Sequence, residues 1–323
     1  MLEGFILNLV EQYSVELEAV APYNFELTVH KPAGWWWSTP DENYRNGICW
    51  TITRFNGELL GLKLQSTGTL QKPLIHCGVY AKTKKGMSEK EQIALMLTRA
   101  LKTEEDLTDF YNLGYKDPIL QDIIKDLYGM HTVGWPELFP ALILAVTLQM
   151  APMKRSNQMM DLLNTNFGEK AIFDGKTVGY WPSPQKIASL TVEELKVKAK
   201  LGYRAVNLIA IAKALSQGFP TMDELYTMDP EEAKKKLLTL QGIGEYSAEL
   251  VMPRMGLPLD VWSAKIFSIL FYSKIPQKPR EAIPILKQVA DERWGEWKAY
   301  AFVYILNDLV KLSERVGFDL TLL

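Results

Sequence analysis

The feature that most constrains the fold of this chain is a single change of hydrophobic period near residue 105. Apolar and polar residues alternate through much of the first hundred residues, and from about residue 106 apolar residues recur at helical spacing. Short helices punctuated by Gly and Pro are expected between 104 and 315. Asn56-Gly57, flanked by two of the expected strands, is a strong hairpin signal. Strands are expected at 14–20, 24–30, 48–55, 59–64 and 74–80.

This change of period divides the chain into two expected domains. We expect a β-rich domain over residues 1–105, closed by a helix at 87–102, and an all-α domain with its own core over residues 106–323. A length of 323 residues is enough for two such domains. The 47% of hydrophobic residues allows a core in each, and excludes a globally disordered chain. The sequence therefore predicts an α+β fold class.

Several other classes of protein are excluded by simple counts. The longest mainly apolar run, 138–151, is interrupted by Pro140 and Gln149 and is too short to span a bilayer. The first five residues carry no basic side chain, so we expect no signal peptide and a cytoplasmic location. With only Cys49 and Cys77, neither a disulfide scaffold nor a four-cysteine metal site can form. Membrane partners are therefore not expected.

Net charge argues against a broadly basic surface. The chain has 36 basic and 38 acidic residues, a formal charge of −2. Any nucleic acid must therefore be bound by a local patch. Lys234-Lys-Lys236 is one basic run, and a second group of cations, with no acid between them, is either such a patch or an ordinary solvated face: Lys196, Lys198, Lys200, Arg204 and Lys213.

A tight turn between two helices is the sharpest local motif, and it lies within 237–251. Gly242-Ile243-Gly244 allows the backbone to turn sharply and to approach a ligand closely. The free N–H groups at the start of the second helix then form a site for one phosphate. The alternative is an ordinary helical hairpin, because two glycines at this spacing are a weak signal alone.

An isolated carboxylate follows this hairpin. Asp260 lies sixteen residues after Gly244, between apolar residues and just before an apolar helix. One interpretation is a helix N-cap, a common place for aspartate. The other is a carboxylate that stabilises a cation or activates water, and one residue can serve both purposes.

Together these motifs resemble the helix-hairpin-helix DNA glycosylase superfamily. The resemblance rests on 240–244, Gly256-Leu-Pro258 and Asp260, and it covers about 120–310. Other segments are similar to the alkylbase branch, 3-methyladenine DNA glycosylase II: 139–149, 166–168, 181–184, 200–205 and 292–301. The resemblance implies that the β-rich domain is the TATA-binding-protein-like antiparallel domain carried by the alkylbase and 8-oxoguanine branches, followed by an all-α glycosylase domain.

The resemblance also implies an activity. It implies a base-excision-repair enzyme that flips an alkylated purine out of duplex DNA and hydrolyses its N-glycosidic bond, which leaves an abasic site. Asp260 would stabilise the oxocarbenium-like transition state. Bifunctional members carry a lysine where this chain has Tyr246, so a monofunctional enzyme without lyase activity is implied, with Lys265 as the only nearby alternative. The partner would be double-stranded DNA with a damaged base, bound by a nucleoid-associated monomer.

Further site residues are implied by the same resemblance. No cofactor is required, although the carbonyls of Leu238, Leu240 and Ile243 are expected to hold a structural Na⁺ or K⁺. Gln149 and Met150 would enter the gap left by the flipped base. The hairpin residues Gly242, Ile243, Gly244 and Tyr246 would bind phosphate, and the base pocket would be walled by Tyr246, Trp262, Trp297, Tyr300 and Tyr304.

Some departures leave alternatives open. Leu250, Val261 and Leu306 stand where the alkylbase enzymes carry further aromatic residues. An oxidised or deaminated purine, such as 8-oxoguanine or hypoxanthine, is therefore an alternative substrate. A non-catalytic protein that binds damaged DNA is a second alternative. The run Gly34-Trp-Trp-Trp37 is expected either to bind DNA or to pack between the domains.

Overall fold

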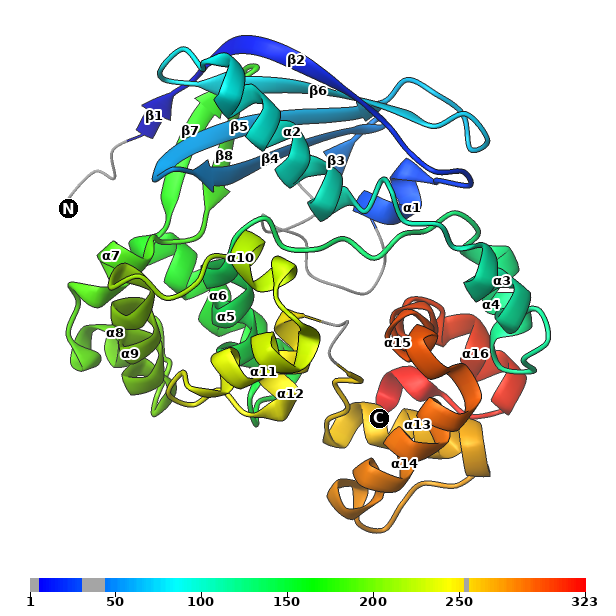
Figure 1. The fold of residues 1–323 in the computed structure, drawn as a ribbon. Helices are drawn as coiled ribbons and strands as arrows, with labels where there is room; N and C mark the ends of the chain where they lie inside the picture. The colour runs from blue at the N-terminus through cyan, green and yellow to red at the C-terminus, as the bar shows by residue number, and fades with distance from the viewer. Residues whose placement is uncertain (1–5, 31–43, 253–255) are drawn as a thin grey trace.

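The structure is a computed structural model that describes residues 6–30, 44–252 and 256–323. Figure 1 shows a β-sheet region at one end and two groups of helices beneath it. One group is built from 138–251, and the other brings 108–126 together with the C-terminal helices. This mixture of an antiparallel sheet and many helices confirms the α+β class. The tryptophans at 35–37 lie outside the described residues.

The larger sheet is antiparallel throughout and has five strands in the order β2-β6-β5-β4-β3. Its hairpin at Asn56-Gly57 is confirmed, since both residues have the positive φ angles, +48° and +82°, that a two-residue turn requires. Residues 49–53 of β4 are all buried, so both faces of the sheet are covered. The strands are β2 Val10–Glu18, β3 Tyr44–Arg45, β4 Ile48–Phe55, β5 Glu58–Ser66 and β6 Leu74–Ala81.

The expected strand at 24–30 is wrong, because this segment forms helix α1 (Phe25–Val29). The Asn24 side chain accepts a hydrogen bond from Leu27 N (3.0 Å), and Thr28 Oγ1 donates to Asn24 O (2.7 Å). An asparagine cap of this kind favours a helical turn over the extended conformation that the alternating pattern indicated.

The expectation of an all-α second half is also wrong. Residues 169–180 form a β-hairpin of β7 (Glu169–Phe173) and β8 (Lys176–Tyr180), and β1 (Ile6–Asn8) pairs in parallel with β7. Asp174 and Gly175 form its turn with φ angles of +48° and +69°, an Asp-Gly signal that the sequence does carry. The hairpin packs on the larger sheet, where the Phe173 ring fills the space that a Cβ on Gly61 would occupy.

Helix α2 (Met87–Leu101) crosses the face of the larger sheet (Figure 1). The remaining helices are short, as their Gly and Pro punctuation predicts. They are α3 Thr108–Gly114, α4 Leu120–Asp126, α5 Leu138–Leu148, α6 Met153–Phe167, α7 Pro184–Ala188, α8 Val192–Lys198, α9 Arg204–Ser216, α10 Met222–Thr227, α11 Pro230–Leu238, α12 Glu245–Val251, α13 Val261–Tyr272, α14 Pro279–Trp294, α15 Lys298–Asn307 and α16 Leu309–Val316. In the described ranges, no helix is long and apolar enough to cross a membrane.

The buried apolar residues form two cores. The first core contains the sheets together with α5–α12, and the second core contains α3, α4 and α13–α16. Residues 106–323 therefore do not share one separate core, which corrects the expectation from the sequence. The chain passes from the first core, which ends at Met252, to the second, which resumes at Leu257. This crossing lies between the glycine hairpin and Asp260.

Candidate active site

The glycine hairpin joins α11 to α12 by a tight turn in which Ile243 N donates to Leu240 O (3.1 Å). Gly242 has a φ of +79°, and a Cβ there would lie 2.2 Å from Asn207 Nδ2, so only glycine fits. Gly244 caps α12 at φ −104°, with open space around its Cβ position. Gly244 and Glu245 are exposed, so the first-turn N–H groups of α12 begin at the protein surface.

The end of α5 is fastened to this hairpin. Gln149, the C-cap of α5, donates from Nε2 to Gly242 O (2.7 Å) and to Ser247 Oγ (3.0 Å). Its own carbonyl accepts a hydrogen bond from the buried Arg204. Gln149 therefore binds the hairpin, whereas the sequence placed it in the DNA wedge.

Met150, the next residue, points away from the protein. Its side chain is 73% exposed and its φ is +49°, an uncommon backbone angle for a residue with a side chain. The structure records one polar neighbour, Arg280, whose Nη2 lies 2.6 Å from the Met150 sulfur. Met150 therefore presents an apolar side chain at the surface, directly after the residue that binds the hairpin.

Asp260 is the N-cap of α13, which confirms the capping interpretation. Its Oδ1 accepts hydrogen bonds from Ser263 N (2.8 Å) and Ser263 Oγ (2.7 Å), and Ser263 Oγ also accepts one from Asp260 N (2.8 Å). This reciprocal box holds the half-buried carboxylate in one orientation. Both side-chain bonds end on Oδ1, so neither occupies Oδ2.

The Tyr246 phenol lies in a buried environment near a negative charge. Burial raises the pKa of the Tyr246 phenol far above its usual value, and the negative charge of Asp260 raises it further. The phenol is therefore neutral at physiological pH and stands within the field of the carboxylate.

The aromatic residues expected to line a base pocket differ in how much of their surface is exposed. Tyr304 is fully buried and donates to Met130 O (2.7 Å), so it is a core residue in this structure. Tyr300 is 7% exposed and donates to the Glu105 carboxylate. Trp262 and Trp297 are half-buried at the edge of the second core. Of the five expected wall residues, Tyr246, Trp262 and Trp297 present accessible surface.

Several of the candidate basic residues have structural partners instead. Arg204 is 7% exposed and donates a hydrogen bond to Gln149 O, so it is not part of an exposed basic patch. The other members of the expected patch are exposed: Lys196, Lys198, Lys200 and Lys213. Lys234 pairs with Glu249 at 3.3 Å. Lys265 Nζ donates to Leu323 O (3.3 Å), so its amine is engaged in a structural contact.

The three carbonyls expected to hold a monovalent ion lie in or beside the hairpin turn. Leu240 O accepts the Ile243 N–H at 3.1 Å, which leaves the second lone pair of this oxygen for an ion. Leu238 is 39% exposed, so solvent reaches this turn. Across the described ranges, no three His, Cys, Asp or Glu side chains gather as a metal site.

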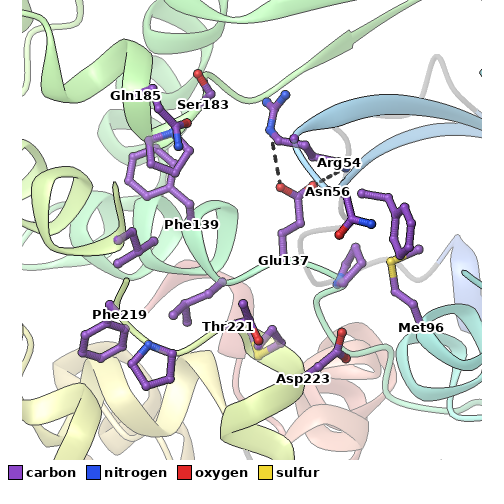
Figure 2. A pocket seen from close by; sticks show the side chains of 18 of the residues that line it. Arg54, Asn56, Met96, Glu137, Phe139, Ser183, Gln185, Phe219, Thr221 and Asp223 are labelled. Carbon is purple, nitrogen blue, oxygen red and sulfur yellow. Dashed lines mark hydrogen bonds and ion pairs between the residues drawn. The ribbon is translucent and has the colours of Figure 1, made fainter. Parts of the chain in front are cut away.

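A pocket of about 790 Å³ lies elsewhere, between the β4–β5 turn, α2 and the start of α10. Figure 2 shows Glu137 at its edge, directed toward Arg54. Burial raises the pKa of Glu137, although Arg54 and the Tyr180 hydroxyl act in the opposite direction. None of the site residues expected from the sequence lines this pocket.

Two residues of the site were missed by the sequence reasoning. Ser263, the partner of Asp260, was detectable as a capping pattern, Asp-x-x-Ser. Glu249 on α12 is 3% exposed and pairs with lysines from two other helices. No sequence signal identified Glu249, because its partners are distant along the chain.

Two relatives are similar in sequence. The chain is 27% identical to a DNA-3-methyladenine glycosylase of Bacillus subtilis (strain 168) over 222 residues, which cover 67% of this chain and 72% of that protein. It is 26% identical to DNA-3-methyladenine glycosylase 2 of Escherichia coli (strain K12) over 177 residues, 55% of this chain and 60% of that protein. No protein-family model matches the chain.

Solved structures share the fold at lower identity. The 3-methyladenine DNA-glycosylase of Archaeoglobus fulgidus aligns with a TM-score of 0.71 at 19% identity, covering 93% of this chain and 98% of that one. The apo 8-oxoguanine glycosylase/lyase of Clostridium acetobutylicum aligns with a TM-score of 0.65 at 14% identity, covering 95% and 99%. Sequence and fold together confirm the resemblance to the helix-hairpin-helix DNA glycosylase superfamily and to its 3-methyladenine branch.

Proposed function

We propose that this chain is a monofunctional DNA glycosylase that removes an alkylated purine from duplex DNA and leaves an abasic site. The observation that carries the proposal is the half-buried carboxylate of Asp260, whose Oδ1 is fixed by two hydrogen bonds from Ser263 at the start of α13. The 3-methyladenine glycosylases named above support the choice of substrate class.

Asp260 would act by electrostatic stabilisation. Cleavage of an N-glycosidic bond gives the sugar oxocarbenium character, and a fixed carboxylate lowers the energy of that positive charge. Ser263 holds Oδ1, so Oδ2 is the oxygen that we assign to the side facing C1′. The base leaves C1′ with the bonding electron pair, water adds its oxygen to C1′ and releases a proton to solvent, and the products are a free base and an abasic site.

The hairpin and the α5 corner would hold the DNA around this chemistry. The α12 N-terminus supplies N–H groups and a positive dipole end for one phosphate, without sequence preference. Met150, fully outside the core, would fill the gap left by the flipped base. Because Gln149 bonds to the hairpin, the two contacts are held at a fixed separation.

The base itself would be recognised by aromatic faces. Alkylated purines such as 3-methyladenine carry a positive charge, and aromatic faces attract cations. Tyr246, Trp262 and Trp297 are the half-buried rings available for this purpose.

The absence of lyase activity follows from the same residues. Tyr246 occupies the place of the Schiff-base lysine and its phenol cannot form an imine. Lys265 donates to Leu323 O. We predict that borohydride traps no covalent complex with damaged DNA, and that strand breaks appear only after hot alkali. A trapped adduct in the wild-type protein would contradict the monofunctional assignment.

The finer architecture is part of this proposal. We propose that 1–105 is a TATA-binding-protein-like domain, supported by its antiparallel sheet and by α2 across one face. The glycosylase part would comprise residues 106–323, whose helices are divided between two cores and whose β7–β8 hairpin packs on the larger sheet. We also propose that the protein acts as a monomer at the nucleoid.

The decisive experiment measures release of free base from duplexes that carry alkylated, deaminated or oxidised purines. We expect release from the alkylated duplex, with binding that weakens steeply as salt increases because phosphates dominate affinity. Release from only the oxidised or deaminated duplex would change the substrate. Salt-sensitive binding without any release would indicate a non-catalytic binding protein.

A further inference from the structure

Glu249 is a buried carboxylate to which the proposed mechanism gives no task. It lies on α12, within the hairpin motif, and is 3% exposed. Its Oε1 lies 3.3 Å from Lys234 Nζ on α11, and its Oε2 lies 2.6 Å from Lys287 Nζ on α14. One carboxylate therefore connects three helices by two ion pairs.

The backbone of Gly256 packs directly on this carboxylate. A Cβ on Gly256 would lie 2.4 Å from Glu249 Oε1 and 2.6 Å from Glu249 Cδ, closer than real contacts allow. No φ in the left-handed region is recorded for Gly256, so a side chain there would be limited by the space that the Glu249 carboxylate takes. The chain thus rests against Glu249 just four residues before Asp260.

This contact lies where the chain passes between the two cores. Helices α11 and α12 belong to the first core and α14 to the second, and Figure 1 shows them in the two separate groups. Residues 256–260 begin the second core and end at the N-cap of α13. Glu249 therefore holds both helical groups and the connecting chain at one point.

We propose that Glu249 is a positioning residue that fixes Asp260 relative to the hairpin. This inference rests on the proposed glycosylase function. Opposite charges on the two groups of helices resist their separation, and the close contact with Gly256 sets the path of the chain into Asp260. A displacement of about 1 Å at a reacting group can reduce a rate by about 100-fold, so such a contact acts on the chemical step.

Glu249→Gln removes the charge and keeps the shape. Under single-turnover conditions with saturating protein, we expect base excision from an alkylated duplex to slow by about tenfold or more. The dissociation constant for a duplex with a non-hydrolysable abasic analogue should change by less than about threefold, since phosphate contacts are kept. The matched control is Glu281→Gln, which breaks an exposed Lys278–Glu281 pair of 2.8 Å on α14 and should leave the rate unchanged.

A second pair of variants tests the contact with Gly256. Gly256→Ala alone should slow excision, because its methyl group displaces the Glu249 carboxylate. In a Glu249→Ala background the methyl group has room, so adding Gly256→Ala should slow excision no further. This non-additivity is a readout that general loss of stability would not produce.

The outcomes separate this inference from the function on which it rests. If the wild-type protein releases no base from any duplex, the proposed function is wrong. If the wild type is active and Glu249→Gln keeps its excision rate, or the two alanine substitutions slow excision additively, the positioning role is wrong. If Glu249→Gln does not fold, Gly256→Ala in the otherwise wild-type chain decides, and an unchanged excision rate in that variant would make the positioning role wrong.

Discussion

At the scale of a single residue, Asp260 caps α13 and is also the carboxylate that we propose stabilises the transition state. Asn accepts the same capping bond from Ser263 N, so Asp260→Asn keeps α13 while it removes the charge. We predict that this variant loses base release and binds duplex DNA within about threefold of wild type, because phosphate contacts are untouched. Single-turnover excision and duplex titration measure the two effects.

Ser263→Ala is the control that weakens the helix cap and keeps the charge of Asp260. It removes the hydroxyl that binds Oδ1 and Asp260 N, but the carboxylate remains. We expect it to lower stability and to retain measurable excision. Normal excision by Asp260→Asn would show that Asp260 is only a cap.

At the scale of the element, the two glycines of the hairpin differ in what they permit. A side chain on Gly242 would strain a φ of +79° and collide with Asn207, so its substitution would disturb folding. Gly244 has open space and an ordinary φ, so Gly244→Val tests the ligand-facing surface alone.

We predict that Gly244→Val weakens binding to damaged and undamaged duplex equally, because the hairpin would contact phosphate and phosphate carries no lesion information. The measurement is a pair of duplex titrations at one salt concentration. Gly179→Val is the control, since Gly179 on β8 also has open space at its Cβ position. A loss restricted to the damaged duplex would place the hairpin in the base pocket.

Asp308, at the junction between α15 and α16, is a buried carboxyl group whose ionisation lowers the stability of the folded protein. Burial raises the pKa of Asp308 to about 6, and the charge of Asp126 adds to the effect. An unfolded aspartate has a pKa of about 4, so the folded state loses stability as the pH rises from about 4 to 6 and stays less stable above it.

We predict that Asp308→Asn stabilises the protein at about pH 8, and that this advantage disappears near pH 4, where both side chains are neutral. Urea unfolding at the two pH values measures the difference. Asp109→Asn, an exposed carboxyl on α3, should show no comparable change between them. Equal stability of Asp308→Asn and wild type at both values would contradict the prediction.

At the scale of the whole molecule, buried tyrosines limit stability at alkaline pH. Burial raises the pKa of Tyr13 and Tyr44 to about 12, and raises the pKa values of Tyr23, Tyr180, Tyr300 and Tyr304 still further. Unfolded tyrosine ionises near pH 10, so above that value the unfolded state binds fewer protons than the folded state. Stability is therefore fully present below about pH 10 and decreases as the pH rises toward 12.

We predict a free energy of unfolding that falls between about pH 10 and 12, accompanied by a jump in tyrosinate absorbance on unfolding. Urea titrations at several pH values, followed by that absorbance, provide the measurement. A native protein whose tyrosines all ionise near pH 10 would contradict the burial on which the prediction rests.

Patterns within a few residues determined much of this protein. Asn56-Gly57 predicts its hairpin, Asp260 predicts the start of α13, and the glycines of 242–244 predict the turn between α11 and α12. The resemblance to the glycosylases follows from the same local signals. They succeed because turns and caps depend on backbone angles and on hydrogen bonds that neighbours in sequence supply.

Contacts between distant residues were decided only by the tertiary structure. The bond from Gln149 to the hairpin spans 93 residues, and the pairing of Glu249 with Lys287 spans 38. Packing buries Arg204 and Tyr304, so Arg204 is not part of the expected basic patch and Tyr304 is not part of the expected pocket wall. Burial and charge pairing depend on which surfaces come into contact when the two cores form. Local sequence patterns do not contain that information.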